Sequence, residues 1–172
     1  MIKNLTIGIF GSGAAEALRV VEEYQKRLTD KTNELIHRLA EIGVEVARAG
    51  FEAAPYDGIK EFSVTFEDRD TNTVAVIATG RTVLFLEFGA GVYYPDSHPY
   101  ANGMVHGTYG KGKGANPYWF YTGQPGTAGG ELAYGHINTT ITHGNPASMA
   151  MYEAHKRVKE DIVRIAREVF NN

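Results

Sequence analysis

The sequence predicts an α+β fold in which a small antiparallel sheet is packed by a long N-terminal helix, or a helix pair, and a C-terminal helix. Three observations predict it. Apolar residues recur every three or four positions over residues 14–50 and again over 146–170, as in helices with one buried face. They alternate with polar residues over 59–67 and 73–79, as in half-buried strands. A Gly- and Tyr-rich stretch, 92–145, precedes the last helix, and we expect it to be a long inserted loop or arm.

The composition is typical of one globular domain that spans residues 1–172, with 43% hydrophobic and 22% charged residues. A formal charge of −3 argues against a mainly electrostatic grip on nucleic acid or anionic lipid. Because the chain has no cysteine, a disulfide framework and a thiolate nucleophile are excluded, and a reducing cytoplasm is compatible. No stretch approaches the roughly 18 apolar residues of a membrane span, and the N-terminus makes a poor signal peptide.

The first elements are a strand and a long helical region. Residues 3–10 alternate and predict a strand that ends at Gly11. The helical pattern then runs from Ala14 to about Gly50. Thr29 and Asp30 have the chemistry of a helix break and a new cap, so one helix and two consecutive helices both fit. The predicted apolar face is formed by Val21, Tyr24, Leu28, Leu35, Leu39, Ile42 and Val46.

The two alternating runs predict a β-hairpin with one solvated face. The apolar run that follows fits a buried strand or a short helix, and we place 82–88 in the sheet with 3–10, 59–67 and 73–79. Glu87 is the one charge in this run, so we expect it to be paired, with Arg81 or an arginine of the C-terminal helix. The run ends at two structural glycines, Gly89 and Gly91, which we expect to include a positive φ and to reject valine.

The last helix has a clear beginning and a clear buried face. Asn145 is the expected N-cap, and Pro146 is expected at the first helical position. The helix should continue to about Phe170. Its predicted buried stripe is Met151, Val158, Ile162, Ile165 and Val169.

The stretch 92–145 has a composition that predicts contact with another molecule. It holds eleven of the twenty glycines and seven of the ten tyrosines, but only four charged residues. Disordered segments are usually charged and poor in aromatic residues, whereas Tyr and Trp provide large contact areas. We therefore expect this segment to order against a partner, most simply another copy of the chain. The candidate interface residues are Tyr93, Tyr94, Tyr100, Tyr109, Tyr118, Trp119, Phe120 and Tyr121.

Candidate sites for cofactors and metals are weak. Residues 6–17 begin like a dinucleotide-binding turn, but Glu16 stands where a small residue is needed and would repel a pyrophosphate. The glycine-lysine run 110–114 lacks the frame of a phosphate-binding loop. Four histidines of the loop, His98, His106, His136 and His143, lack the spacing of metal ligands.

Catalytic chemistry is equally weakly indicated. None of the four serines lies in a nucleophile elbow. The acidic residues around the hairpin are most simply a solvated edge; they are Asp57, Glu61, Glu67, Asp68 and Asp70. We expect no catalytic residue, no cofactor and no metal, and therefore a protein that is not an enzyme.

Several short motifs, taken in order, resemble one known family. They are FLEFGAG at 85–91, HGTYG at 106–110, YWFY at 118–121 and GNPASMAMY at 144–152. This order of segments, after an N-terminal helix and a hairpin, is similar to the head–tail joining or tail-completion (neck) proteins of long-tailed double-stranded DNA bacteriophages and prophages. The similarity covers most of the chain.

The resemblance implies a non-enzymatic structural protein of the virion neck or tail, made in the bacterial cytoplasm. It implies a homo-oligomeric ring, with six or twelve copies, between the head-completion or connector protein and the tail-tube protein. DNA would pass through the lumen without sequence-specific binding, which a mildly acidic chain favours. No membrane contact is implied.

Two alternatives remain open from the sequence. One is a small ligand- or metal-binding enzyme in which 92–145 forms a glycine-rich lid. The other is an adaptor, for example of a toxin–antitoxin pair, that binds protein partners without forming a ring.

Overall fold

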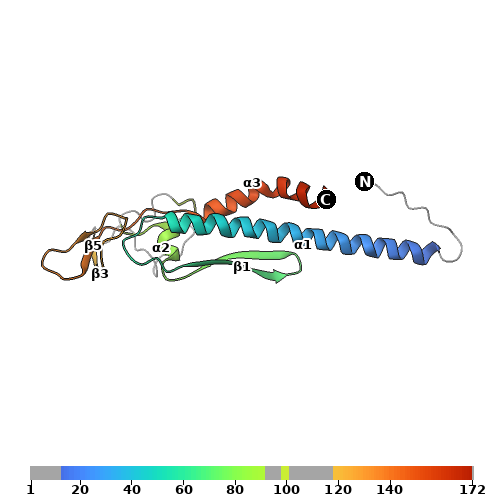
Figure 1. Ribbon diagram of the computed structural model, residues 1–172. Helices are drawn as coiled ribbons and strands as arrows, with labels where there is room; N and C mark the ends of the chain where they lie inside the picture. The colour runs from blue at the N-terminus through green and yellow to red at the C-terminus, as the bar shows by residue number, and fades with distance from the viewer. Residues whose placement is uncertain (1–12, 92–97, 101–117, 172) are drawn as a thin grey trace.

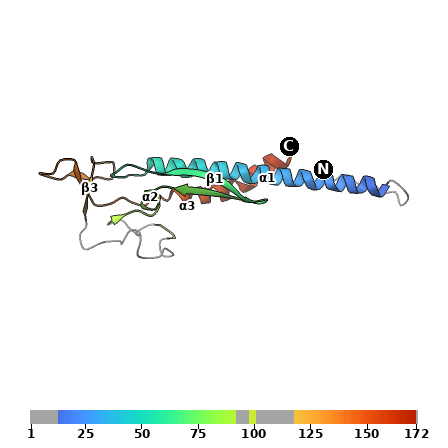
Figure 2. The same ribbon diagram turned by 90° about the horizontal axis from the view of Figure 1, so that it is seen from below.

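The computed structural model describes residues 13–91, 98–100 and 118–171 of the chain. Within these residues the protein is elongated, and helix α1 (Gly13–Ala53) runs along most of its length. Helix α3 (Ala150–Asn171) and the β1–β2 hairpin lie along α1, and a second small sheet lies beyond the C-terminal end of α1 (Figures 1 and 2). The predicted α+β class is confirmed.

α1 is one helix of 41 residues, so the choice between one helix and two is settled in favour of one. The residues that suggest a break are accommodated within it. The hydroxyl of Thr29 donates to the carbonyl of Gln25 at 3.1 Å, and that of Thr32 donates to the carbonyl of Leu28 at 2.8 Å. These bonds to the preceding turn hold both side chains inside a continuous helix.

α3 packs antiparallel on the C-terminal half of α1. Leu39 of α1 packs with Ile165 and Val169 of α3, while Ala150, at the start of α3, lies against Gly50. A β-carbon on Gly50 would lie 2.8 Å from that of Ala150, so glycine permits the close approach of the two helices. The main core, beside this contact, is formed by Ala47, Phe51, Ala54, Val64, Val83, Leu86, Ala150 and Ala154.

The first sheet has two strands, β1 (Ser63–Asp70) and β2 (Thr73–Thr79). They pair antiparallel as predicted, with Val64 opposite Ala78. The prediction that 82–88 forms a further strand is wrong: α2 (Val83–Phe88) is a short helix. The loop before it fixes this outcome, because the Thr82 hydroxyl and amide both bond to the Glu61 carbonyl and the Thr82 carbonyl accepts from the Leu86 amide. The predicted strand 3–10 lies outside the described residues.

The second sheet lies within the stretch that was expected to be a loop. It consists of β3 (Trp119–Thr122), β4 (Glu131–Leu132) and β5 (Thr139–Thr142), in the order β3-β5-β4. All its pairs are antiparallel. We refer to it as the distal sheet. The stretch 92–145, expected as an extended loop or arm, thus contains three short strands, and strands of two to four residues are too short to produce a recognisable alternation.

None of the helices in the described residues is sufficiently long and apolar to cross a membrane.

Candidate subunit interface

The Glu87 carboxylate joins α2 to the beginning of α3. Glu87 is buried, with 5% of its surface exposed. Oε2 accepts from the Met151 amide at 2.8 Å, and Oε1 accepts from the Tyr152 amide at 3.0 Å. The first amides of a helix have no partner within the helix, and a negative charge there is favoured by the helix dipole. Glu87 therefore acts as the cap of α3.

Asn145 does not have the capping role that the sequence suggests. α3 begins at Ala150 rather than at Pro146. The Asn145 side-chain amide donates to the carbonyl of Phe85 at 2.8 Å instead. The residue is buried, so it joins the segment before α3 to the end of α2. The sequence prediction was wrong because a distant carboxylate can cap a helix, which leaves the local asparagine free for another contact.

His98 completes the contact around Glu87. Its Nε2 lies 3.0 Å from Oε1 of Glu87, and its Nδ1 accepts from the Tyr100 amide at 3.0 Å. Since Nδ1 accepts, the proton is on Nε2, which donates to the carboxylate. The ring also packs on Phe88, with 4.2 Å between centroids. Both ring nitrogens are used, so His98 holds residues 98–100 against the body of the molecule.

The expectation that Glu87 is paired is confirmed, but its partners are not the expected arginines. Arg81 lies 3.6 Å from Glu61. On α3, Arg157 and Arg164 pair with Asp161. The missed partner, His98, is eleven residues away along the chain, and no spacing rule connects it to Glu87.

A metal site built on the loop histidines is not formed by the described residues. His106 lies outside them. The described part of the chain brings together no group of three His, Cys, Asp or Glu residues that could hold a metal ion. His143 instead lies near the ring of Tyr118, with 6.3 Å between centroids.

Asp57 holds the distal sheet to the body, and its assignment to a solvated edge is wrong. The residue is 6% exposed. Oδ1 accepts from the Ala128 amide at 3.0 Å, and Oδ2 accepts from the Thr142 hydroxyl at 2.8 Å. Next to it, the Thr127 amide donates to the Tyr56 carbonyl at 2.9 Å. The sequence lacks a signal for this role, because Ala128 and Thr142 lie 71 and 85 residues further along the chain.

A cleft of about 640 Å³ lies where the distal sheet meets the body. Aromatic side chains on its walls include Tyr56, Trp119 and Tyr121, and its acidic residues are Asp57 and Glu61. The pKa of Tyr56 is raised, first by burial and then by the nearby Tyr121 and Glu61. No Lys, Arg or His occurs among the described residues that line the cleft. The aromatic walls of the cleft favour a cationic side chain of a partner.

Most of the predicted interface residues that can be described are exposed. Tyr100, Tyr118, Trp119 and Phe120 are exposed, whereas Tyr121 is half-buried. Tyr93, Tyr94 and Tyr109 lie outside the described residues. The sequence analysis missed three further exposed apolar residues in and after β4, namely Leu132, Tyr134 and Ile137. An apolar residue in a turn is the signal that could have identified them, since turns are usually polar.

Both predicted structural glycines have positive φ, as expected, at 80° for Gly89 and 64° for Gly91. A β-carbon on Gly91 would lie 2.3 Å from the carbonyl oxygen of His143 and 2.4 Å from the ring of Trp119. Gly91 therefore allows the segment after α2 to pass directly beneath Trp119.

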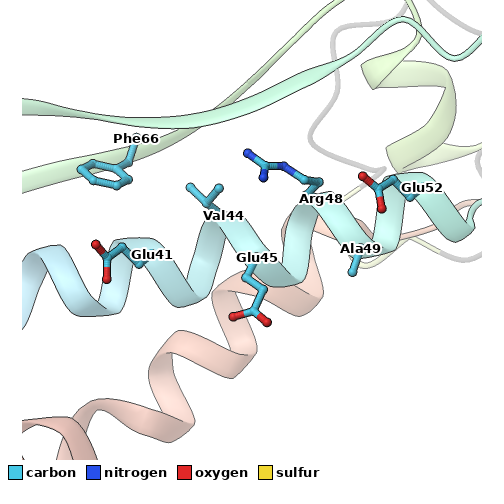
Figure 3. A pocket seen from close by; sticks show the side chains of 7 residues that line it. All are labelled: Glu41, Val44, Glu45, Arg48, Ala49, Glu52 and Phe66. Atoms are coloured by element: carbon cyan, nitrogen blue, oxygen red, sulfur yellow. The ribbon is translucent and has the colours of Figure 1, made fainter.

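A groove of about 360 Å³ lies between α1 and β1 (Figure 3). Three glutamates of α1 lie along it, but their carboxylates point in different directions (Figure 3). The Arg48 guanidinium donates to the Val64 carbonyl at 3.1 Å and thereby joins α1 to β1. Without converging polar groups, the groove lacks the arrangement of a binding or catalytic centre.

Comparisons of the chain with protein-family models, with curated proteins and with solved structures find no match.

Proposed function

We propose that the chain is a structural subunit of the neck of a long-tailed double-stranded DNA phage, where a ring of its copies joins the head connector to the tail tube or completes the tail. The subunit performs no catalysis. The observation that carries the proposal is the apolar surface of the distal sheet and the residues beside it. Trp119, Phe120, Leu132, Tyr134 and Ile137 are each exposed and lie in or beside the distal sheet, which is at one end of the molecule (Figure 1).

An exposed group of large apolar residues is characteristic of a surface that another protein covers. Aromatic residues are also the types most enriched at the energetic centres of protein interfaces. The adjoining cleft adds aromatic walls that favour a basic side chain from the partner. These features support assembly through the distal sheet.

The segment on which the family resemblance rests also has a structural purpose consistent with the proposal. Within residues 85–91, Glu87 caps α3, Gly89 lies against the backbone of residues 145–147, and Gly91 lets the chain pass beneath Trp119. The motif thus positions the distal sheet relative to the helices. The net charge of −3 suits a conduit through which DNA slides, because a basic lumen would hold the phosphates.

The proposal is tested by inactivating the gene in the phage or prophage that encodes the chain and examining particles by electron microscopy. We expect filled heads and tails that are not joined, or tails of abnormal length. Wild-type protein supplied in trans should restore complete virions, whereas the double variant Trp119→Ala/Phe120→Ala should not. As a matched control, Phe170→Ala removes an exposed aromatic ring of α3, outside the distal sheet. Complete virions in the absence of the chain would contradict the proposal.

A further inference from the structure

The N-terminal half of α1 extends beyond the elements that cover its other half. α1 has 41 residues and α3 has 22, so α1 is about 28 Å longer at 1.5 Å per residue. Glu168, near the end of α3, lies 2.6 Å from Arg38, and Asp68 of the hairpin lies 2.6 Å from His37. Residues 13–34, which we call the overhang, project past both elements (Figures 1 and 2).

The overhang continues the same apolar face that α3 covers further along α1. Leu35, Leu39 and Ile42 belong to the cluster shared with α3. At about 100° per residue, Val21, Tyr24 and Leu28 fall within about 60° of them around the helix axis. Leu18 lies at the edge of this face. The four overhang residues are 60, 52, 67 and 46% exposed, in the order Leu18, Val21, Tyr24 and Leu28.

The charges of the overhang lie almost entirely on its other side. Eight of the nine fall between about 40° and 180° from Leu18 on the same helical projection, whereas the apolar face is centred near 270°; they are Glu16, Arg19, Glu22, Glu23, Lys26, Arg27, Asp30 and Glu34. Lys31 is nearest to the apolar face and lies 3.3 Å from Glu34. The overhang therefore has a solvated face and a neutral face, which is the pattern of a helix that packs against another helix.

We infer that copies of this chain associate through the overhang, with each apolar face packed in parallel against the overhangs of neighbouring copies. The spacing of three and four residues matches a helical partner, because α3 occupies the same face further along the helix. With Leu18 the face spans about 120°, and Ala14 and Ala17 lie within it, which suits a bundle of several helices better than a two-helix seam. The parallel direction rests on the proposed ring, since cyclic symmetry orients all copies alike.

The first test uses the absence of cysteine from the chain. Val21→Cys and Leu28→Cys are prepared separately in the full-length protein and oxidised. Parallel packing places each residue beside its own counterpart, so each single variant should form covalent dimers. Lys26→Cys, on the charged face, is the control and should form at least tenfold fewer. Equal cross-linking of all three would overturn the inference.

The same experiment distinguishes parallel from antiparallel packing of the overhangs. Positions 21 and 28 are about 10 Å apart along the helix. In an antiparallel pair, each single variant fails to cross-link, but a mixture of the two succeeds. That result would overturn the parallel arrangement. A monomer without cross-links in any combination would overturn association through the overhang altogether.

The second test compares Leu28→Glu with Lys26→Glu by light scattering. Leu28 lies outside the two hydrophobic clusters of the core, so Leu28→Glu should remain folded, which circular dichroism checks. We expect it to weaken self-association at least tenfold, whereas Lys26→Glu should change it less than twofold. If virion assembly requires the chain but tolerates both variants equally, the inference fails and the proposed function stands. If Leu28→Glu alone abolishes association but virions form without the chain, the proposed function fails and self-association through the overhang stands.

Discussion

The two ends of the molecule, the distal sheet and the overhang, both expose apolar side chains. The interactions that keep each end structurally ordered are different. The distal sheet is held by contacts within the chain. Asp57 accepts from the backbone and a side chain of that sheet, and Gly126 passes so close to Tyr56 that a β-carbon would lie 2.1 Å from its carbonyl oxygen. The overhang has helical hydrogen bonds and surface ion pairs such as Arg19–Glu16, while its apolar face stays exposed.

This difference separates a preformed surface from one that depends on assembly. Isolated helices in water are marginal, and most helical stability in proteins comes from packing of the apolar face. The overhang therefore needs a partner to be fully ordered. The distal sheet is small, but buried hydrogen bonds fix it before any partner binds.

The largest effect is expected for Gly91→Val, which attacks the support of the distal sheet. The added side chain meets the His143 carbonyl and the Trp119 ring at a φ of 64°. Left-handed strain of about 1–2 kcal/mol and overpacking of about 1–3 kcal/mol together give a loss on the order of 4 kcal/mol in the free energy of unfolding. Urea unfolding measures it.

Gly129→Ala is the control for that substitution. Gly129 also has a positive φ, of 94°, but a β-carbon there would meet no atom within 4 Å. Only the backbone strain remains, so the free energy of unfolding should fall by about 1 kcal/mol. Equal losses at the two glycines would mean that Trp119 does not pack on Gly91 as described.

Asp57→Ala should detach the distal sheet and leave the overhang unchanged. It removes an acceptor from the Ala128 amide and the Thr142 hydroxyl, both in a buried region, at a cost of about 3 kcal/mol. Amide hydrogen exchange should accelerate in residues 119–142 but not in 14–34. Asp57→Asn keeps one acceptor oxygen and should lose less. Faster exchange along the whole chain would show that the two ends are not independent.

Glu87→Gln tests the contact between α2 and the beginning of α3, which lies between the distal sheet and the overhang along the molecule (Figure 1). The substituted amide keeps the size of the side chain but replaces a charged acceptor at the start of α3 with one carbonyl and one donor. A loss of about 2 kcal/mol follows from hydrogen bonds to a charged group. Thermal unfolding measures the loss, and exchange at Met151 and Tyr152 should increase first. Unchanged exchange at these two amides would contradict the capping role.

The smallest expected effect is a loss of stability at acidic pH, at the contact between the C-terminal half of α3 and α1. The pKa of Asp161 is lowered, first by the hydrogen bond from Arg157, and the pKa of Glu168 is lowered, first by the hydrogen bond from Arg38. Carboxyl groups with a lowered pKa in the folded state stabilise it above their unfolded pKa and lose this contribution as the pH falls through the folded value.

The contribution should therefore be complete at pH 6 and decline below about pH 4. The thermal midpoint of the wild type should fall between pH 6 and pH 3 by more than that of Glu168→Gln. An identical decline in both would remove the role assigned to Arg38–Glu168. The exposed ion pairs of the overhang, Arg19–Glu16 and Arg19–Glu23, should contribute little to the difference.

The sequence predicted the elements that are marked by a periodic pattern of apolar residues or by the chemistry of neighbouring residues. The helical period over 14–50, the hairpin alternation over 59–79 and the positive φ of Gly89 and Gly91 all follow from nearby residues. The apolar face at Val21, Tyr24 and Leu28 was also visible, but the sequence does not reveal that α3 stops before reaching it.

Contacts between distant residues could not be predicted. Glu87 finds His98 and the amides of α3, while Asp57 finds Ala128 and Thr142. These contacts depend on the folded arrangement rather than on spacing along the chain. The same arrangement makes 82–88 a helix, since the bonds between Thr82 and Glu61 determine how the chain leaves β2.

The central claim is that the order of the overhang is provided by other copies, whereas that of the distal sheet is provided by its own chain. Amide hydrogen exchange of the full-length protein at rising concentration tests it directly, with the mass measured in parallel. We predict that exchange of residues 14–34 slows as copies associate, while exchange of residues 119–142 stays constant. Equal protection of the overhang in the monomer and in the associated protein would contradict the account.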